Sequence, residues 1–88
     1  MQLREAIIYR INKLLNEYDL TEYALSMQAG IPPSTLNDFI RGKVLLPRLD
    51  NLLHICEGFN IELKEFFDDP VFKDVEFDRK KWFFNCPY

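Results

Sequence analysis

Gly30 separates two short segments with helical periodicity, and this turn is the feature that most restricts the fold. The segment before it starts at Thr21, whose side chain can cap a helix, and runs to Ala29. The segment after it starts at Pro33, which suits a first helical turn, and runs to about Arg41. A tight reversal between short helices usually needs a positive φ, which glycine adopts without strain. The sequence therefore predicts a helix-turn-helix, a unit whose second helix can enter the major groove of DNA.

An amphipathic helix of about four turns is predicted ahead of this unit, over residues 3–18. Its charged residues, among them Arg10 and Lys13, are assigned to a solvent-facing side. The apolar positions that predict the helix are Leu3, Ile7, Ile11, Leu14, Leu15 and Tyr18.

Two more helices are predicted after the helix-turn-helix. The first covers residues 49–59 and ends at Asn60, a plausible left-handed cap. The second is short, covers residues 61–67 and is ended by residues 68–70, whose two aspartates we interpret as a solvated stop. The apolar positions that predict these helices are Leu49, Leu52, Leu53, Cys56, Phe59, Ile61, Leu63, Phe66 and Phe67.

Length and charge limit the class of protein. A chain of 88 residues suits one small domain, and its 48% hydrophobic content can form a core without disulfides. The net charge of −3 has the wrong sign for coating nucleic acid non-specifically, so any such contact must be a local patch. Residues 1–48 hold six cations and five anions, whereas residues 49–88 hold five and nine. The predicted helix-turn-helix thus lies in the less acidic half.

The sequence offers no chemistry for an enzyme, a metal site or a cofactor. Cys56, Cys86 and His54 are not spaced as metal ligands, and no nucleophile is paired with a base. We expect Cys56 in the core and His54 at the surface. No apolar run approaches the roughly 20 residues that span a bilayer, and the N-terminal segment lacks a cleavage-site pattern. We expect no membrane partner and a reducing, cytoplasmic context.

Residues 20–42, LTEYALSMQAGIPPSTLNDFIRG, resemble the Cro/phage-repressor (Xre-type) family, and the resemblance extends over about residues 3–69. It implies an all-α, five-helix lambda-repressor-like domain. It also implies a sequence-specific transcriptional regulator that binds double-stranded operator DNA as a homodimer. The matching positions are Leu20, Thr21, Leu25, Ala29, Gly30, Ile31, Ser34, Thr35, Leu36, Arg41 and Gly42.

The resemblance implies that exposed positions of the helix over residues 33–41 read base edges. An amide such as Asn37 can bridge an adenine edge, and a carboxylate such as Asp38 can accept from cytosine N4. By position, the base-reading candidates are Pro33, Ser34, Asn37 and Asp38.

Three cations close to this helix are the candidates for phosphate contacts. Arg48 can in addition extend towards the minor groove. The three cations are Arg41, Lys43 and Arg48, and the remaining candidates for DNA contact are Thr21, Glu22 and Thr35.

Structural alternatives to these roles remain open. Ser34 and Thr35 can instead cap the second helix of the unit. Asn37 and Asp38 can belong to a solvated face that has no function. Arg41 can pair with Asp38 on the adjacent turn, an exposed pair that contributes only about 0.2 to 0.5 kcal/mol.

A second function class also remains open. Glu22 stands where the family often has a phosphate-contacting glutamine, and Asp38 would also repel phosphate. A protein-interaction module, such as an antitoxin-like or regulatory partner, can keep the same fold while its acidic surface binds protein. The cations favour a DNA-binding function, and the anions favour a protein-binding function.

Residues 70–88 form an aromatic C-terminal extension beyond the domain of residues 1–69. Residues 71–75 fit a helical turn, whereas residues 75–78 alternate as an edge strand does, and the sequence does not decide between them. The extension can pack on its own domain, support dimerisation or bind a protein partner. Residues 79–81 are a basic run that is either solvated or extends a DNA contact. The large apolar residues of the extension are Val71, Phe72, Val75, Phe77, Trp82, Phe83 and Phe84.

Overall fold

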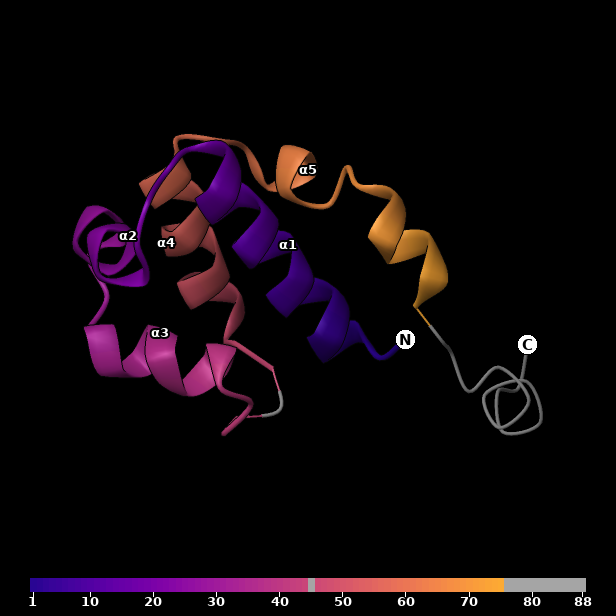
Figure 1. Cartoon of the computed structure of the whole chain (residues 1–88), viewed down its shortest axis with the longest axis horizontal. Helices are drawn as coiled ribbons and strands as arrows, with labels where there is room; N and C mark the ends of the chain where they lie inside the picture. Colours follow the sequence, from indigo (N-terminus) through magenta and orange to yellow (C-terminus); the bar gives the residue numbers. More distant parts are fainter. Residues whose placement is uncertain (45, 76–88) are drawn as a thin grey trace.

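The computed structural model describes residues 1–44 and 46–75, and every regular element in these ranges is helical (Figure 1). This arrangement confirms the all-α fold with five α-helices that the sequence predicts. A 3₁₀ helix, η1, follows the last of them. The elements are α1 (Leu3–Glu17), α2 (Glu22–Ala29), α3 (Pro33–Ile40), α4 (Leu49–Phe59), α5 (Leu63–Phe66) and η1 (Pro70–Asp74).

The local signals that delimit the helices act as the sequence predicts. The Thr21 hydroxyl accepts a hydrogen bond from the Ala24 backbone N–H at 3.0 Å and caps α2. Gly30 ends α2 with a φ of 73°, and the buried Ile31 follows it in the turn. Asn60 ends α4 in the left-handed conformation, with a φ of 59°. These three ends fix the lengths of the helices that hold the helix-turn-helix in place.

The helix-turn-helix is held against the rest of the domain by close packing of α2 on α4. At Gly58 of α4, a Cβ atom would lie 3.0 Å from the backbone nitrogen of Ala29, so a side chain here would require α2 to shift by a few tenths of an ångström. Leu25 of α2 is fully buried in the same core as Cys56 of α4, which confirms the predicted core position of Cys56. Burial raises the pKa of the Cys56 thiol to about 11, so this cysteine is unreactive.

Five apolar residues that the periodicity assigns to buried faces are instead substantially exposed, among them Phe67, which follows the end of α5. Leu3 and Leu49 are the first residues of α1 and α4 and project past the end of the core. Leu53 lies one turn after Leu49 on the same side of α4. Tyr18 follows the end of α1 and covers Phe59 with its ring, at a centroid distance of 5.7 Å. The prediction that these residues are buried is therefore wrong.

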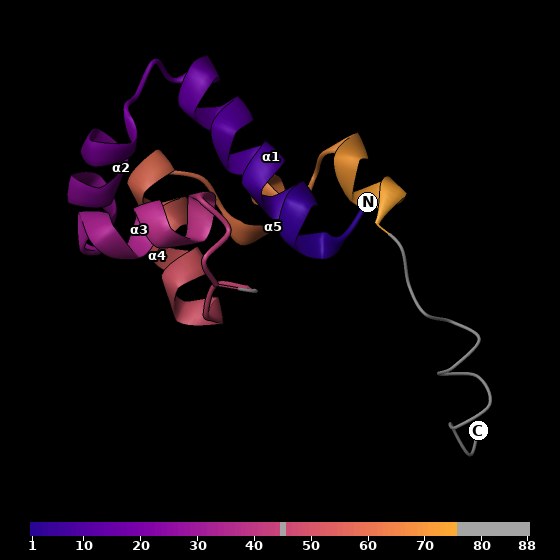
Figure 2. The same ribbon diagram turned by 60° about the horizontal axis from the view of Figure 1, so that its bottom comes forward.

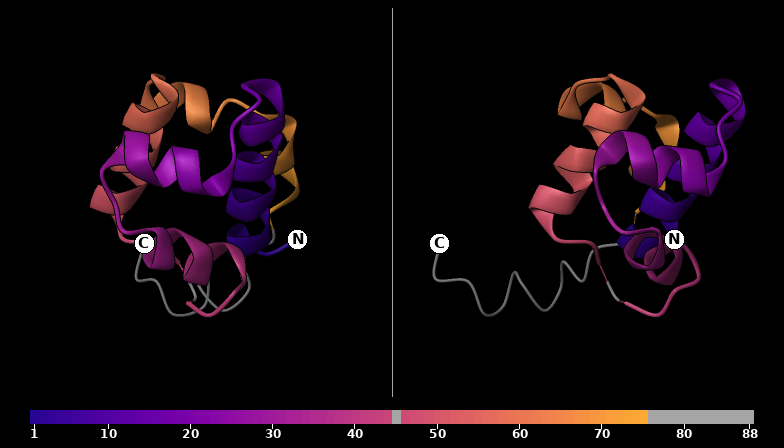
Figure 3. Two further views of the ribbon diagram at one scale, coloured as in Figure 1. Left: turned by 60° about the vertical axis from the view of Figure 1, so that its left-hand side comes forward. Right: turned by 90° about the vertical axis from the view of Figure 1, so that its left-hand side faces the viewer.

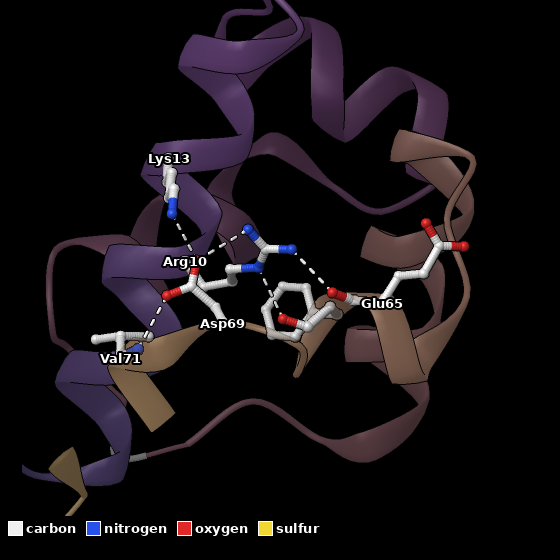
Figure 4. Close-up of polar contacts among 6 residues, drawn as sticks. Arg10, Lys13, Glu65, Asp69 and Val71 are labelled. Atoms are coloured by element: carbon white, nitrogen blue, oxygen red, sulfur yellow. Dashed lines mark hydrogen bonds and ion pairs between the residues drawn. The ribbon is translucent and has the colours of Figure 1, made fainter. Parts of the chain in front are cut away.

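Arg10 is buried, and its prediction as a solvent-facing residue of α1 is also wrong. Its guanidinium donates from Nε to the Phe66 carbonyl at 2.7 Å and from Nη2 to the Glu65 carbonyl at 2.8 Å (Figure 4). A third donor, Nη1, lies 3.2 Å from Oδ2 of Asp69. Arg10 thereby joins the middle of α1 to the last turn of α5, where the Glu65 carbonyl also accepts from the Asp68 N–H at 3.2 Å.

Asp69 is buried as well, which corrects its interpretation as part of a solvated stop. Its Oδ2 also accepts from Lys13 Nζ at 2.7 Å, and its Oδ1 accepts from the Val71 backbone N–H at 2.9 Å (Figure 4). The Lys13 hydrogen bond, followed by the Val71 N–H, lowers the pKa of the Asp69 carboxyl. The carboxylate thus pairs with α1 and caps η1 at the same time.

The first part of the C-terminal extension is a helical turn that packs on α1 of its own chain. Val71 is buried, and the half-buried Phe72 lies beside the core. The Phe72 ring is 6.1 Å from that of Phe66 and 5.0 Å from that of Phe67. Among the large apolar residues of the extension, Phe77, Trp82, Phe83 and Phe84 lie outside the described residues.

Candidate nucleic-acid interface

The helix α3 presents a polar face to solvent because its opposite face is anchored in the core. Figure 3 (left panel) shows α3 at the lower edge of the domain, below α2. Leu36, Phe39 and Ile40 are buried and fix the rotation of α3 about its axis. The outward face carries the four base-reading candidates: Pro33, Ser34 and Asn37 are exposed, and Asp38 is partly exposed.

The residues at the start of α3 do not cap it. The N-cap position is Pro32, and no side chain accepts a hydrogen bond from the first turn. Ser34 and Thr35 lie inside that turn and are both exposed. The alternative that they cap α3 is therefore wrong, and no capping bond engages their hydroxyls. Thr21, by contrast, uses its hydroxyl as the cap of α2.

Each of the three candidate phosphate-binding cations lies beside a carboxylate. Arg41 Nη1 is 3.5 Å from Oε2 of Glu22. Lys43 Nζ is 3.7 Å from Oδ1 of Asp38, so Asp38 pairs with Lys43 and not with Arg41. This corrects the alternative of an Arg41–Asp38 pair within α3. The Arg41–Glu22 contact instead joins the end of α3 to the first residue of α2.

The third pair joins Arg48 Nε to Oδ1 of Asp50 at 3.3 Å. Asp50 has no predicted role, although its position two residues after Arg48, in the first turn of α4, indicates that its carboxylate can reach the guanidinium. All three cations are more than half exposed, and exposed ion pairs contribute little. A phosphate can therefore displace these carboxylates at small cost. The surface is nevertheless locally balanced in charge.

The described residues contain no group of histidine, cysteine or acidic side chains that could hold a metal ion. No described helix has the length and apolar character needed to cross a membrane. His54 is exposed, as predicted, with its Nδ1 3.9 Å from Oε1 of Glu57. The candidate interface therefore consists of the exposed face of α3 and the three ion pairs beside it.

The model of the Cro/C1-type HTH DNA-binding domain matches residues 10–70. The chain belongs to this family. The match covers α2, α3, α4 and α5 completely, together with the second half of α1, so the Cro/C1-type assignment includes the helices that build the interface. Members of this family bind DNA and are generally not enzymes. No match to the chain is found among curated proteins or among solved structures.

Proposed function

We propose that the protein is a sequence-specific transcriptional regulator that inserts α3 into the major groove of double-stranded operator DNA. One observation carries this function: in a Cro/C1-type HTH domain, three buried side chains fix α3 so that its polar face lies outside the core. The role requires no cofactor, and we infer that two copies act together on a two-fold site. It implies the cytoplasmic location that the sequence analysis expects.

Under this proposal the side chains divide into two groups. Asn37, Ser34 and the edge of Asp38 read bases, with Pro33 at the entry of the groove. The phosphate contacts come from Arg41, Lys43 and Arg48, aided by Thr21 and Thr35 at the helix starts, whereas Glu22 faces the phosphates and weakens these contacts. Because the phosphate-facing surface also holds carboxylates, we expect moderate affinity that depends strongly on salt.

The decisive experiment is selection of bound duplexes from a random DNA pool by the full-length chain, followed by sequencing. A regulator of this kind is expected to enrich one motif. Recovery of unrelated sequences would contradict sequence-specific binding.

Replacing Arg41, Lys43 and Arg48 together by alanine is expected to weaken binding to every DNA sequence. Each lost phosphate contact should lower the slope of log affinity against log salt by about 0.9, because fewer counterions are released. Fluorescence anisotropy at several salt concentrations measures both quantities. Replacing Arg4, Lys64 and Lys73, which lie on α1, α5 and η1, by alanine provides a matched loss of three positive charges. An unchanged slope in the triple variant would show that these three cations do not contact phosphates.

Glu22→Gln is expected to tighten DNA binding by about three- to tenfold at low salt. The change removes a charge that faces phosphate and releases Arg41 from its 3.5 Å contact, which matters modestly because the pair is exposed. Glu57→Gln removes an exposed carboxylate from α4 and is the control. Equal gains in both variants would indicate a general charge effect.

Asn37→Ala is expected to cost roughly 1 to 3 kcal/mol on the selected site and to relax preference at one base position. The affinities of the natural chain and the Asn37→Ala variant for every single-base variant of the site measure both effects. A uniform loss across the variants would instead assign Asn37 to the DNA backbone.

A second candidate function, a protein-interaction module, is favoured by the carboxylate beside each cation. Its protein partner could bind this surface or the extension over residues 70–88. It predicts that the random pool yields no enriched motif and that the triple alanine variant binds DNA no differently. The DNA experiments therefore separate the two functions.

A further inference from the structure

A hollow of about 300 Å³ lies between α3, the first turns of α4 and the loop that joins them. Its inner wall is made of side chains of the buried core, namely Leu36, Phe39 and Ile55. On the loop side it is lined by Val44 and Leu46, which are 43% and 50% exposed. An apolar cavity of about 150 Å³ holds a benzene ring, so this hollow has room for a larger aromatic side chain.

Exposed apolar side chains continue from the hollow along α4. Leu49, the first residue of α4, is 72% exposed, more than any other large hydrophobic residue described. Leu53 lies one turn later on the same side and is 44% exposed. Neighbouring exposed apolar side chains of this kind mark an interaction site. The occupant of this site should therefore carry one aromatic group for the hollow and further apolar groups for α4.

The segment over residues 76–88 of the same chain has this composition. Trp82, Phe83 and Phe84 follow one another in it, and three cations precede them directly. The segment holds three cations and two anions, a net charge of +1, whereas residues 1–75 hold eight cations and twelve anions, a net charge of −4. Opposite net charges favour contact between the segment and its own domain.

The length of the segment and the place where it begins allow this contact. The Met1 ammonium donates to the Asp74 carbonyl at 3.3 Å, so the chain reaches Val75 beside the N-terminal end of α1. In Figure 1 and Figure 2, the loop that joins α3 to α4 lies between α3 and that end of α1. Residues 76–82 can span roughly 23 to 25 Å when extended, which matches the length of about 22 Å expected for the 15 residues of α1. Trp82 can therefore reach the hollow from Val75.

The covalent link favours this segment over other occupants. A segment tied to its site by a short linker has an effective concentration in the millimolar range. A small molecule, another protein or the same segment of a second copy has to overcome that advantage to fill the hollow.

We propose that residues 76–88 dock on their own domain, with Trp82 in the hollow and the two phenylalanines that follow it against Leu49 and Leu53. The docked segment competes with DNA, because three residues that line the hollow are also candidate DNA contacts. This competition rests on the proposed function, whereas the docking does not. The three shared residues are Thr35, Asp38 and Arg48.

Trp82 is the only tryptophan of the chain, so its fluorescence reports the docking. In the full chain its emission is expected at shorter wavelength, and its quenching by acrylamide is expected to be weaker, than in the isolated peptide of residues 76–88. Leu46→Lys, at the rim of the hollow, is expected to move both quantities towards those of the peptide. Met27→Lys, at a 62% exposed position of α2, is the matched control and should leave them unchanged. Circular dichroism of each variant verifies the helical fold.

Binding to the selected DNA site tests the competition. Trp82→Ser, which removes no charge, is expected to bind that site about tenfold more tightly, the factor expected when the docked state holds roughly 90% of the free chains. Tyr9→Ser, which removes a 51% exposed aromatic side chain from α1, is the control and should leave the affinity unchanged. Adding the DNA to the natural chain is expected to move the Trp82 emission towards that of the peptide.

Three results would overturn the docking. The first is a natural chain whose Trp82 emission and quenching match those of the peptide. The second is a Leu46→Lys variant that leaves both quantities unchanged, and a shift in Phe67→Lys instead, at a 40% exposed position, would place the segment on α5. The third is an emission that approaches that of the peptide on dilution while sedimentation velocity shows a dimer dissociating, since the segment would then fill the hollow of a second copy.

The competition and the proposed function fail by different results. A Trp82→Ser variant that binds DNA no more tightly than the natural chain would overturn the competition alone. A random pool without an enriched motif would instead contradict the proposed function, and the fluorescence would still decide the docking.

Discussion

Arg10→Met is expected to destabilise the fold by about 3 to 5 kcal/mol, the largest effect of any single substitution considered. The variant keeps the apolar stem of the side chain but removes the guanidinium donor from the Phe66 carbonyl and one of the two donors from the Glu65 carbonyl, which keeps the Asp68 N–H. It also removes one of the two cations that face the buried Asp69. Urea unfolding followed by circular dichroism measures the loss.

A matched variant at the rim of the same cluster separates burial from charge. Lys13→Met removes the other partner of Asp69, but Lys13 is 40% exposed and makes no contact with α5 carbonyls among the described hydrogen bonds. It is expected to cost much less than Arg10→Met. Equal losses would show that the carboxylate pairing dominates and that the two carbonyl contacts of Arg10 contribute little.

Acidification is expected to weaken the same cluster. The folded-state pKa of Asp69 is lowered, first by the Lys13 hydrogen bond and then by the Val71 N–H, so its carboxylate stabilises the fold above the ordinary pKa of about 3.9. That contribution is lost as the pH falls through this value towards the lowered pKa. Asp69→Asn, which can still accept from Val71, should flatten the stability profile in this acidic range, below the ordinary pKa of aspartate. An unchanged profile would assign the acid sensitivity to other carboxylates.

The elements predicted correctly are those with signals inside a few residues of sequence. The Thr21 cap and the left-handed Gly30 and Asn60 each involve partners within about one helical turn, so side-chain chemistry alone locates them. The packing of α2 on α4 is not local, but the family resemblance implies it. Fold class and helix boundaries were therefore within reach of the sequence.

Arg10 shows why another part of the structure could not be predicted from the sequence. Its spacing from Ile7 and Leu14 places it on the buried stripe of α1, yet its charge led to a solvent-facing assignment. The acceptors that make burial possible, around Phe66 and Asp69, lie more than 50 positions away in the sequence. No local pattern reveals them, and Asp69 was misassigned for the same reason.

The candidate site likewise has features that the sequence predicts and features that it does not. Exposure of the α3 face followed from its buried positions, whereas the Arg41–Glu22 pair joins residues 19 positions apart and depends on how α2 and α3 pack. The exposure of Leu49 also escaped prediction, because periodicity gives the direction of a side chain but not where the core ends.

Ending the chain at Asp69 instead of Val75 is expected to lower the free energy of unfolding by about 2 to 4 kcal/mol. Burial of Val71 and part of Phe72 contributes roughly 1.5 to 3 kcal/mol for a full side chain, less the entropy of ordering η1. The shorter chain also lacks the Val71 N–H, which donates a hydrogen bond to Asp69 Oδ1. A buried carboxylate oxygen thus loses that partner.

Comparison of the chains 1–69 and 1–75 isolates η1, because both lack residues 76–88. A domain of this size should melt more than about 10 °C lower for a loss of that magnitude. Since η1 packs on α1 of its own chain, the difference should not depend on protein concentration, whereas a contribution made through a dimer would. Equal melting of the two chains would show that η1 adds nothing to the fold. A further drop between the full chain and 1–75 would instead place stabilising contacts in residues 76–88, where the remaining aromatic side chains of the extension lie.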